Sequence, residues 1–172
     1  MTTVIPPPVS ALIRSALFVR DRKRSKQFYQ ALGLTNLYFE GVLSHPSASE
    51  VLGLSEHRPY EVSIVKSKGP NFGMVGLFEI ARPDTDEPVR SGPARCGESA
   101  LVFYVDDLDV VLPALSAAGA SWTGSAVTFE LGHFCQREIC LRDPDGFLLN
   151  LVERPPSGQL QSGPEMEFTP LD

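Results

Sequence analysis

The feature of this sequence that most restricts its fold is an internal repeat of helix signals. The paired signals are Asp21 with Gly33 and Asp107 with Gly119; each pair spans twelve residues, and the second follows the first by 86 residues. An aspartate can cap the start of a helix, and a glycine can end one. The apolar segments before the aspartates also match, since residues 17–19 correspond to residues 103–105. We infer an internal duplication with a strand and then a helix in each copy.

The end of each copy carries a further match. Residues 75–79 align with residues 149–153, and both segments end in glutamate. Two more strands are predicted between the helix and this last strand in each copy. They are residues 37–42 and 60–66 in the first copy and residues 127–131 and 137–141 in the second. The predicted fold class is therefore α+β, with two βαβββ modules whose helix-free faces would enclose a shared cavity.

Composition along the chain predicts the module boundaries. Residues 83–98 hold three prolines and two glycines among charged residues, which favours an exposed linker. We therefore expect the first module at residues 11–82 and the second at residues 99–154. Residues 1–10 are rich in proline and are interpreted as a loose N-terminal segment, and residues 155–172 as a C-terminal tail on the surface or disordered.

The helices and the last hairpin have the clearest local patterns. Their expected inner faces are Ser25, Phe28, Tyr29 and Leu32 in the first helix and Leu108, Val111, Leu112 and Leu115 in the second. Residues 143–146 read Asp-Pro-Asp-Gly between two apolar segments, which predicts a tight turn between two strands. Asn150 is the one polar residue between leucines in the second of these strands.

The overall charge and hydropathy argue against several classes of protein. A formal net charge of −6 and a pI near 5.1 argue against a nucleic-acid partner. The one basic cluster, residues 20–26, lies at a predicted helix start and is interpreted as a solvated helix face. There is no stretch of 18 apolar residues and no secretory leader, so we expect a cytoplasmic protein with no membrane partner.

The cysteines and histidines show no metal-binding spacing. Cys96, Cys135 and Cys140 form no Cys-x-x-Cys pair and are odd in number, which also argues against a disulfide framework. We interpret them as free thiols, buried or half-buried. The three histidines, His45, His57 and His133, all fall in predicted loops and are expected at the surface or filling gaps.

A set of short motifs runs through both copies. They are Val-Arg-Asp at residues 19–21, Ser25, Phe-Tyr at 28–29, Leu-Gly at 32–33, Val-Asp-Asp-Leu-Asp at 105–109, Ala-Gly-Ala at 118–120 and Asp-Pro-Asp-Gly at 143–146. Together they resemble the vicinal oxygen chelate superfamily, over roughly residues 12–154. That superfamily includes glyoxalase I, extradiol dioxygenases, fosfomycin-resistance enzymes and bleomycin-resistance proteins. The resemblance implies a cupped mixed sheet around a shared cavity, helices outside, and it favours a homodimer.

The resemblance also implies a divalent metal held by four side chains, usually His, Gln or Glu. The matching positions here are Arg14, Gly76, Ala100 and Asn150. A guanidinium has no lone pair to donate, alanine and glycine have no donor, and asparagine is a weak neutral ligand. We therefore expect no metal and no other cofactor.

Glu79 is the fallback metal ligand, if the alignment with the superfamily is shifted by three residues. The internal repeat places Glu79 opposite Glu153, and three residues along a strand reverse the direction of the side chain. Both glutamates are thus expected to point away from Gly76 and Asn150. A divalent metal cofactor is expected only if the fallback holds.

Strand alternation predicts the residues that line the cavity. They are Arg14, Ala16, Phe18, Met74, Gly76 and Phe78 from the first module and Ala100, Val102, Tyr104, Leu148, Asn150 and Val152 from the second. We select Arg14, Phe18, Gly76, Ala100, Tyr104 and Asn150 as ligand-binding candidates. Arg14 can bind a carboxylate or phosphate of a ligand, pair structurally with Asn150, a backbone carbonyl or a nearby acid, or simply be exposed near the start of its strand. Tyr104 can equally be a core residue, and Asn150 can equally bind Arg14 or a buried water.

The leading functional hypothesis is a metal-independent small-molecule-binding protein of the glyoxalase/bleomycin-resistance type. Its ligand is mainly apolar, with one anionic or carbonyl group. The alternative is an enzyme, a glyoxalase-like lyase or isomerase or a dioxygenase-like protein, with a relocated or non-standard metal site. The sequence places no catalytic residue for it. A structural or interaction module is a third interpretation.

Overall fold

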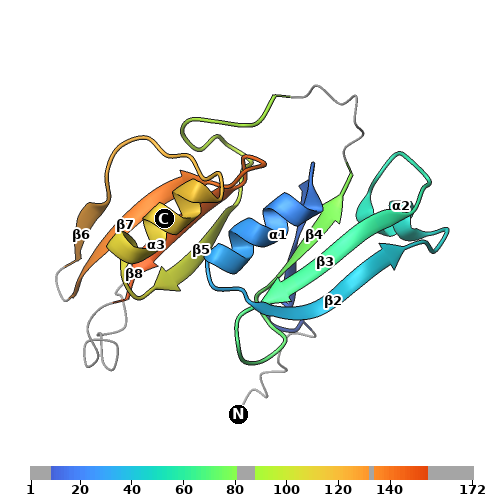
Figure 1. The fold of residues 1–172 in the computed structure, drawn as a ribbon, viewed down its shortest axis with the longest axis horizontal. Helices are drawn as coiled ribbons and strands as arrows, with labels where there is room; N and C mark the ends of the chain where they lie inside the picture. Colours follow the sequence, from blue (N-terminus) through green and yellow to red (C-terminus); the bar gives the residue numbers. More distant parts are fainter. Residues whose placement is uncertain (1–8, 81–87, 132–133, 155–172) are drawn as a thin grey trace, which may run out of the picture. The chain divides into compact units, whose positions relative to one another are not determined.

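The computed structural model describes residues 9–80, 88–131 and 134–154 of the chain. The chain divides into two compact units, the first within residues 1–86 and the second within residues 87–172. Each unit has one four-stranded mixed sheet with a helix on one face, as Figure 1 shows. The predicted α+β class with two βαβββ modules is confirmed. Among the described residues, no helix has the length and apolar character needed to cross a membrane.

Unit 1 holds the first copy of the repeat. Its elements are β1 (Arg14–Val19), α1 (Arg22–Ala31), β2 (Asn36–Leu43), α2 (Ala48–Leu52), β3 (Tyr60–Lys66) and β4 (Met74–Glu79). The strand order is β1-β4-β3-β2, so the last strand lies between the first and the third. β1 and β4 are parallel, and the other two pairs are antiparallel. The short helix α2 is an addition that the second unit lacks in its described part.

Unit 2 repeats the same topology. Its elements are β5 (Ala100–Val105), α3 (Leu108–Ala117), β6 (Val127–Leu131), β7 (Phe134–Arg142) and β8 (Leu148–Glu153). The strand order is β5-β8-β7-β6, again with the first and last strands parallel. The predicted strands 60–66 and 127–131 have the observed bounds. β7 is longer than the predicted 137–141, which matters for the site below.

The two main helices begin in the predicted way. The Asp21 carboxylate accepts a hydrogen bond from the Arg24 amide at 3.0 Å, and the Asp107 carboxylate accepts one from the Asp109 amide at 2.8 Å. Both capping residues have extended backbone, as an N-cap requires. The aspartates at the centre of the sequence repeat are thus the helix caps.

The glutamates that end the two copies bind the same helices. Oε2 of Glu79 accepts the Arg22 backbone N–H at 2.9 Å, and Oε2 of Glu153 accepts the Leu108 N–H at 2.9 Å. A carboxylate at a helix N-terminus also interacts favourably with the helix dipole. The last strand of each unit is therefore hydrogen-bonded to the first turn of the long helix of the same unit.

The core of each unit lies between the sheet and its long helix. Fully buried side chains are Phe28, Tyr29, Val75 and Leu77 in unit 1 and Leu108, Leu115, Leu149 and Leu151 in unit 2. Leu77 and Leu151 occupy the same place in their units and are each 0% exposed. Alternate residues of each strand face the helix, as a strand period of two requires.

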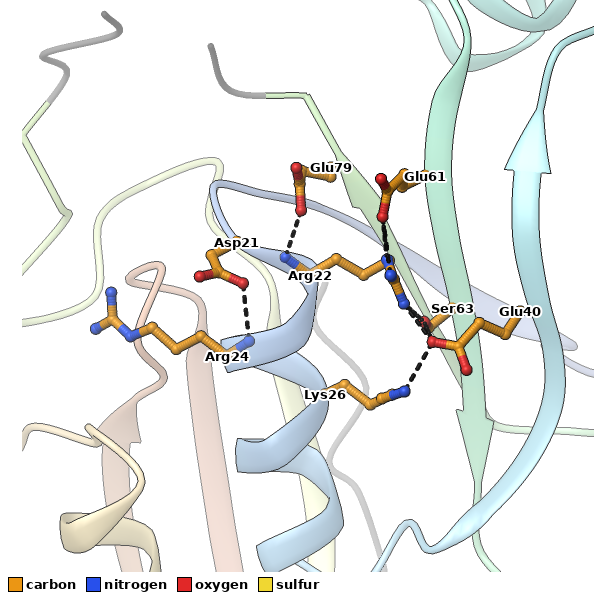
Figure 2. A network of polar contacts seen from close by, with 8 residues as sticks. All are labelled: Asp21, Arg22, Arg24, Lys26, Glu40, Glu61, Ser63 and Glu79. Atoms are coloured by element: carbon orange, nitrogen blue, oxygen red, sulfur yellow. Dashed lines mark hydrogen bonds and ion pairs between the residues drawn. The ribbon is translucent and has the colours of Figure 1, made fainter. Parts of the chain in front are cut away.

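Arg22 makes the helix side of unit 1 unlike that of unit 2. Its guanidinium is bonded to Glu61 at 2.8 Å, to Ser63 at 2.6 Å and to Glu40, and Lys26 also pairs with Glu40 at 2.7 Å (Figure 2). The interpretation of residues 20–26 as a solvated face is therefore wrong for Arg22, which is buried. A buried guanidinium needs such partners to offset its lost hydration.

The segment before β5 is held on unit 2 by one buried arginine. The Arg142 guanidinium donates to the carbonyls of Gly92 at 3.0 Å and Pro93 at 3.1 Å, and pairs with Glu98 at 2.9 Å. The Arg142 contact, with hydrogen bonds from Arg95 and Arg90, lowers the pKa of Glu98 to about 2. The exposed segment predicted as a linker is thus anchored over its described part.

The Asp-Pro-Asp-Gly turn joins β7 to β8 as predicted. Oδ1 of Asp143 accepts the amides of Asp145 at 2.9 Å and Phe147 at 2.8 Å. Gly146 has a φ of +92°, and a Cβ there would lie 2.7 Å from the Arg90 carbonyl oxygen. The glycine is therefore required both by backbone conformation and by close approach of the preceding segment.

Candidate functional site

The candidate residues lie on the sheet face opposite the long helix in each unit, called here the far face. In unit 1 the far face carries Arg14, Ala16, Phe18, Tyr60, Val62, Ile64, Met74, Gly76 and Phe78. In unit 2 it carries Ala100, Val102, Tyr104, Gln136, Glu138, Cys140, Leu148, Asn150 and Val152. The structure thus brings Arg14, Phe18 and Gly76 together in one unit, and Ala100, Tyr104 and Asn150 in the other. One ligand site built from both groups stays a prediction.

The far face of unit 1 is mostly covered by its own side chains. Val62, Ile64, Met74 and Phe78 form a buried cluster, and Phe18, Leu43 and Leu52 pack against it. The rings of Phe18 and Phe78 have centroids 6.1 Å apart. Met74 and Phe78, which strand alternation predicts in a cavity lining, are therefore core residues of this unit.

Arg14 occupies the space beside Gly76. A Cβ at Gly76 would lie 2.9 Å from Cδ of Arg14 and 3.0 Å from Cε2 of Phe78. The glycine is expected to leave room where relatives hold a metal, and the aliphatic stem of Arg14 takes that room. Arg14 is half-buried, and across the described ranges its guanidinium has no hydrogen bond or ion pair.

The far face of unit 2 is open in its centre. Val102 is 64% exposed and Tyr104 is 57% exposed, although both lie within β5. The Arg154 guanidinium lies 5.9 Å from the centroid of the Tyr104 ring. Tyr104 is therefore not a core residue of unit 2, which removes one alternative for it.

A polar row crosses β7 and β8 on the same face. Nε2 of Gln136 donates to Oε1 of Glu138 at 2.6 Å, and Nδ2 of Asn150 donates to Oε2 of Glu138 at 2.9 Å. Oδ1 of Asn150 is shielded from solvent and has no hydrogen-bond partner. We call Gln136, Glu138 and Asn150 the acceptor row, because Glu138 at its centre accepts a hydrogen bond from both amides.

Sequence reasoning identified Asn150 but missed Gln136 and Glu138. The predicted strand begins at residue 137, whereas β7 begins at Phe134 and places both residues within the sheet. Strand alternation is the signal that could have identified them. Gln136 and Glu138 alternate with Arg137 and Ile139, so the two polar side chains lie on the same face of the strand, the far face.

The expected metal positions do not fit a divalent metal. The stem of Arg14 fills the place beside Gly76, and Asn150 leaves only one neutral amide oxygen unpaired. The carboxylate of Glu79, the fallback ligand, accepts the Arg22 amide on the helix side of the sheet. Within residues 9–80, 88–131 and 134–154, no group of three or more His, Cys, Asp and Glu side chains converges to hold a metal.

The described cysteines are more accessible than expected. Cys96 and Cys140 are both exposed free thiols, so the expectation that they are buried or half-buried is wrong. Cys140 pairs with Asn150 across β7 and β8 and lies on the far face. The side chain of Cys135 lies outside the described residues. An exposed thiol beside the acceptor row supplies a natural reporter for that surface.

Comparison with known proteins gives consistent results for sequence and fold. A sequence model of the Glyoxalase/Bleomycin resistance protein/Dioxygenase superfamily matches residues 11–151. A glyoxalase family protein from Bacillus cereus is 22% identical with a TM-score of 0.64, covering 89% of this chain and 97% of that one. A glyoxalase/dioxygenase from Nostoc punctiforme is 20% identical with a TM-score of 0.56, covering 90% and 98%. Comparison with curated protein sequences gives no match.

Proposed function

The chain belongs to the Glyoxalase/Bleomycin resistance protein/Dioxygenase superfamily, and from this premise we propose that it is a metal-independent protein that binds a small molecule. The ligand is mainly apolar and carries one carboxylate or carbonyl group, which binds the guanidinium of Arg14. A homodimer, a cytoplasmic location and the absence of a nucleic-acid partner stay predictions.

The observation that carries this proposal is the state of Arg14. Arg14 is half-buried with its aliphatic stem against Gly76, and no described residue accepts a hydrogen bond from its guanidinium. A carboxylate can accept two parallel hydrogen bonds from this planar group. Phe18 is half-buried on the same face of β1 as Arg14 and offers apolar contact for the ligand body.

The second support is the chemistry of the four positions where relatives hold a metal. The side chains of Arg14, Gly76 and Ala100 have no lone pair to offer, and Asn150 offers one neutral amide oxygen. A site with this composition can bind and orient a ligand by packing and hydrogen bonds. It does not supply the oxygen and nitrogen ligands that divalent-metal catalysis requires.

Fragment binding tests the role of Arg14. 3-Phenylpropionate and its neutral counterpart 3-phenylpropanol are titrated into the isotopically labelled protein, and amide shifts of β1 and β4 are followed by NMR. The carboxylate is expected to bind more tightly, and Arg14→Met to weaken it by about tenfold or more. Lys23→Met, an exposed change on α1, is the control for net charge. Equal affinity of the two fragments, or of the two variants, refutes the proposal.

Metal analysis separates this proposal from the enzyme alternative. The protein is purified from media containing zinc, nickel and iron, and bound metal is measured per chain. Glu79→Gln removes the fallback ligand, and Glu153→Gln is the matched control because both glutamates bind a helix amide in the same way. If the wild type holds one metal per chain and only Glu79→Gln loses it, the proposal of metal-independent binding is rejected. The lyase, isomerase or dioxygenase alternative would then take its place.

A further inference from the structure

We propose that the charges between helix and sheet select the correct partner during folding, so that each sheet accepts the first strand and helix of its own copy and rejects those of the other copy. We call β1 with α1 and β5 with α3 the two arms, and the strands β2–β4 and β6–β8 the two ribbons. The selection acts on the helix side of each sheet. It therefore does not rest on Arg14 or on the function proposed above.

The need for such a selection follows from the topology. In both units the strand of the arm pairs in parallel with the last strand of the ribbon, which comes later in the chain. The two ribbons have the same strand order, and both end in a glutamate that binds a helix amide. An arm can therefore dock on the wrong ribbon with the same backbone pairing, and misassembly of this kind is a characteristic failure of repeat proteins.

The ion pairs on the helix side have opposite polarity in the two units. In unit 1 the helix carries the cation, and the guanidinium of Arg22 binds the carboxylate of Glu61 on β3 at 2.8 Å (Figure 2). In unit 2 the strand carries the cation, and the two terminal nitrogens of Arg137 on β7 donate to Asp109 on α3 at 2.9 Å and 3.1 Å.

The strand register shows which residues of the two ribbons are equivalent. Val62 pairs with Phe78, and Glu138 pairs with Val152. Phe78 and Val152 each directly precede the glutamate that ends their strand. The residues on either side of Val62 and Glu138 therefore correspond on the helix side. They are Glu61 with Arg137 and Ser63 with Ile139.

Docking of the first arm on the second ribbon would leave Arg22 without its partners. The guanidinium would meet the cation of Arg137 where it now binds Glu61, and the apolar side chain of Ile139 where it now binds Ser63. Arg22 is buried in its own unit. A buried charge that loses its partners is strongly unfavourable, so this arrangement carries the larger penalty.

Docking of the second arm on the first ribbon would bring like charges together. Asp109 would lie near Glu61, and the apolar Leu108, which follows its capping residue as Arg22 does, supplies no cation for Glu61 and Glu40. The native pair of Asp109 is exposed, and exposed pairs stabilise little by themselves. The selection therefore comes mainly from the charges that wrong docking leaves unpaired or opposed.

Three double variants of the full-length chain test the selection at constant net charge. Asp109→Lys with Arg137→Glu reverses the polarity of the unit 2 pair. Asp109→Asn with Arg137→Gln removes its charges, and Asp109→Glu with Arg137→Lys keeps the polarity and is the matched control. Urea unfolding gives the midpoint of each variant, so that refolding is compared at equal distances below the midpoint.

Carbodiimide cross-linking reports where each arm has docked, because it joins a lysine to a carboxylate in ion-pair contact. The pair of Lys26 and Glu40, 2.7 Å apart, reports correct docking of the first arm in every variant. Each protein is cross-linked before unfolding and again after refolding by dilution from urea. Peptide mass spectrometry then measures the recovery of this link, and in the reversed variant a link from the lysine introduced at position 109 to Glu61 reports wrong docking.

The control is expected to recover the link between Lys26 and Glu40 as fully as the wild type. In the reversed variant both ribbons present a carboxylate at this place, so the two ways of docking approach equal yield and recovery is expected to fall by about twofold. The link from position 109 to Glu61 is expected to appear. The neutral variant is expected to lie between the two.

Several results would overturn the proposal. Equal recovery in the reversed variant and the control refutes it, and so does a loss in the control, which keeps the polarity. A loss in the reversed variant without the link from position 109 to Glu61 also refutes it, because aggregation then accounts for the loss. If the reversed variant does not fold, equal recovery in the neutral variant and the control is the refuting result.

Discussion

Val62 and Glu138 occupy the same place in the two units, yet their surroundings differ completely. Val62 pairs with Phe78 and Glu138 pairs with Val152, each on the far face of its sheet. Val62 is 2% exposed in an apolar cluster, whereas Glu138 is half-buried and accepts hydrogen bonds from Gln136 and Asn150. The same framework therefore supports a packed far face in one copy and an open one in the other.

The difference shows which half of each unit carries its stability. On the helix side, both units bury leucines fully and bind the first helix amide with a glutamate. Those features are required to hold the helix on the sheet. In its described part, the far face of unit 2 lacks the apolar cover that Leu52 of α2 helps to give unit 1, and Val102 and Tyr104 are exposed there.

The largest loss of stability is expected when the glutamate that unit 2 has at this place is introduced into unit 1. Val62→Glu places a carboxylate in an apolar cluster without a cationic partner, and we expect a cost of about 4 kcal/mol or more, or loss of soluble protein. Urea unfolding gives the free energy. Val102→Glu, on the open face, is the control and is expected to cost less than about 1 kcal/mol. Comparable losses would mean that the far faces do not differ in packing.

The helix-side cores of the two units are expected to lose similar amounts of stability when a buried leucine is truncated. Leu77→Ala and Leu151→Ala remove side chains that are each 0% exposed at matching places. Each is expected to cost about 2–5 kcal/mol, because a cavity is left under the helix. Urea unfolding of the two single variants and the double variant is the measurement. A large loss in one unit and none in the other would break the proposed symmetry of the helix-side cores.

Acid is expected to weaken the ion pairs of Glu40 with Arg22 and Lys26 in unit 1. The hydrogen bond from Lys26, with those from Ser63 and Arg22, lowers the pKa of Glu40 from 4.5 to about 2. Because the folded pKa lies below the unfolded one, this stabilisation is present above pH 4.5 and is lost as the pH falls through about 2.

The pH dependence of urea unfolding, compared between wild type and Glu40→Gln, is the measurement for this network. The variant is expected to lose less stability over the acid range, since it has no proton to take up at this position. An identical acid profile in the two proteins would show that Glu40 contributes nothing to the pH dependence. NMR titration of the Glu40 carboxyl gives an independent check of its pKa.

The smallest effect is expected at the centre of the open face. Val102→Ala removes two methyl groups from a side chain that is 64% exposed, so we expect a change within about 0.5 kcal/mol. Ile64→Ala, on the packed far face, is expected to cost about 2–5 kcal/mol by comparison. A loss above about 1.5 kcal/mol for Val102→Ala would show that another surface covers this face.

The repeat could be predicted because its signals are local. Asp21 and Asp107 cap helices through hydrogen bonds to amides only two or three residues away, so the sequence alone carries the pattern. The Asp-Pro-Asp-Gly turn is local in the same sense. The alternation of the strands then placed Arg14 and Gly76 on one face, and their contact follows from the register of β1 and β4.

The acceptor row and the Arg22 network could not be predicted, for a shared reason. Arg22 meets Glu61 from 39 residues away, and Glu138 replaces Val62 at a place where the offset between the copies is no longer 86. Pairings of this kind depend on strand register, which one sequence does not reveal. The basic run around Arg22 therefore suggested a solvated surface, although one of its members is buried.

The position of the closing glutamates has a consequence for the order in which the chain folds. Glu79 is 57 residues from the Arg22 amide that it binds, and Glu153 is 45 residues from the amide of Leu108. Each glutamate ends the strand that lies between the first and third strands of its sheet. During synthesis, β1 has no neighbouring strand in its sheet until β4 has emerged from the ribosome. The first strand of each sheet can therefore pair only after the last strand has been inserted beside it, so we expect each sheet to be completed late.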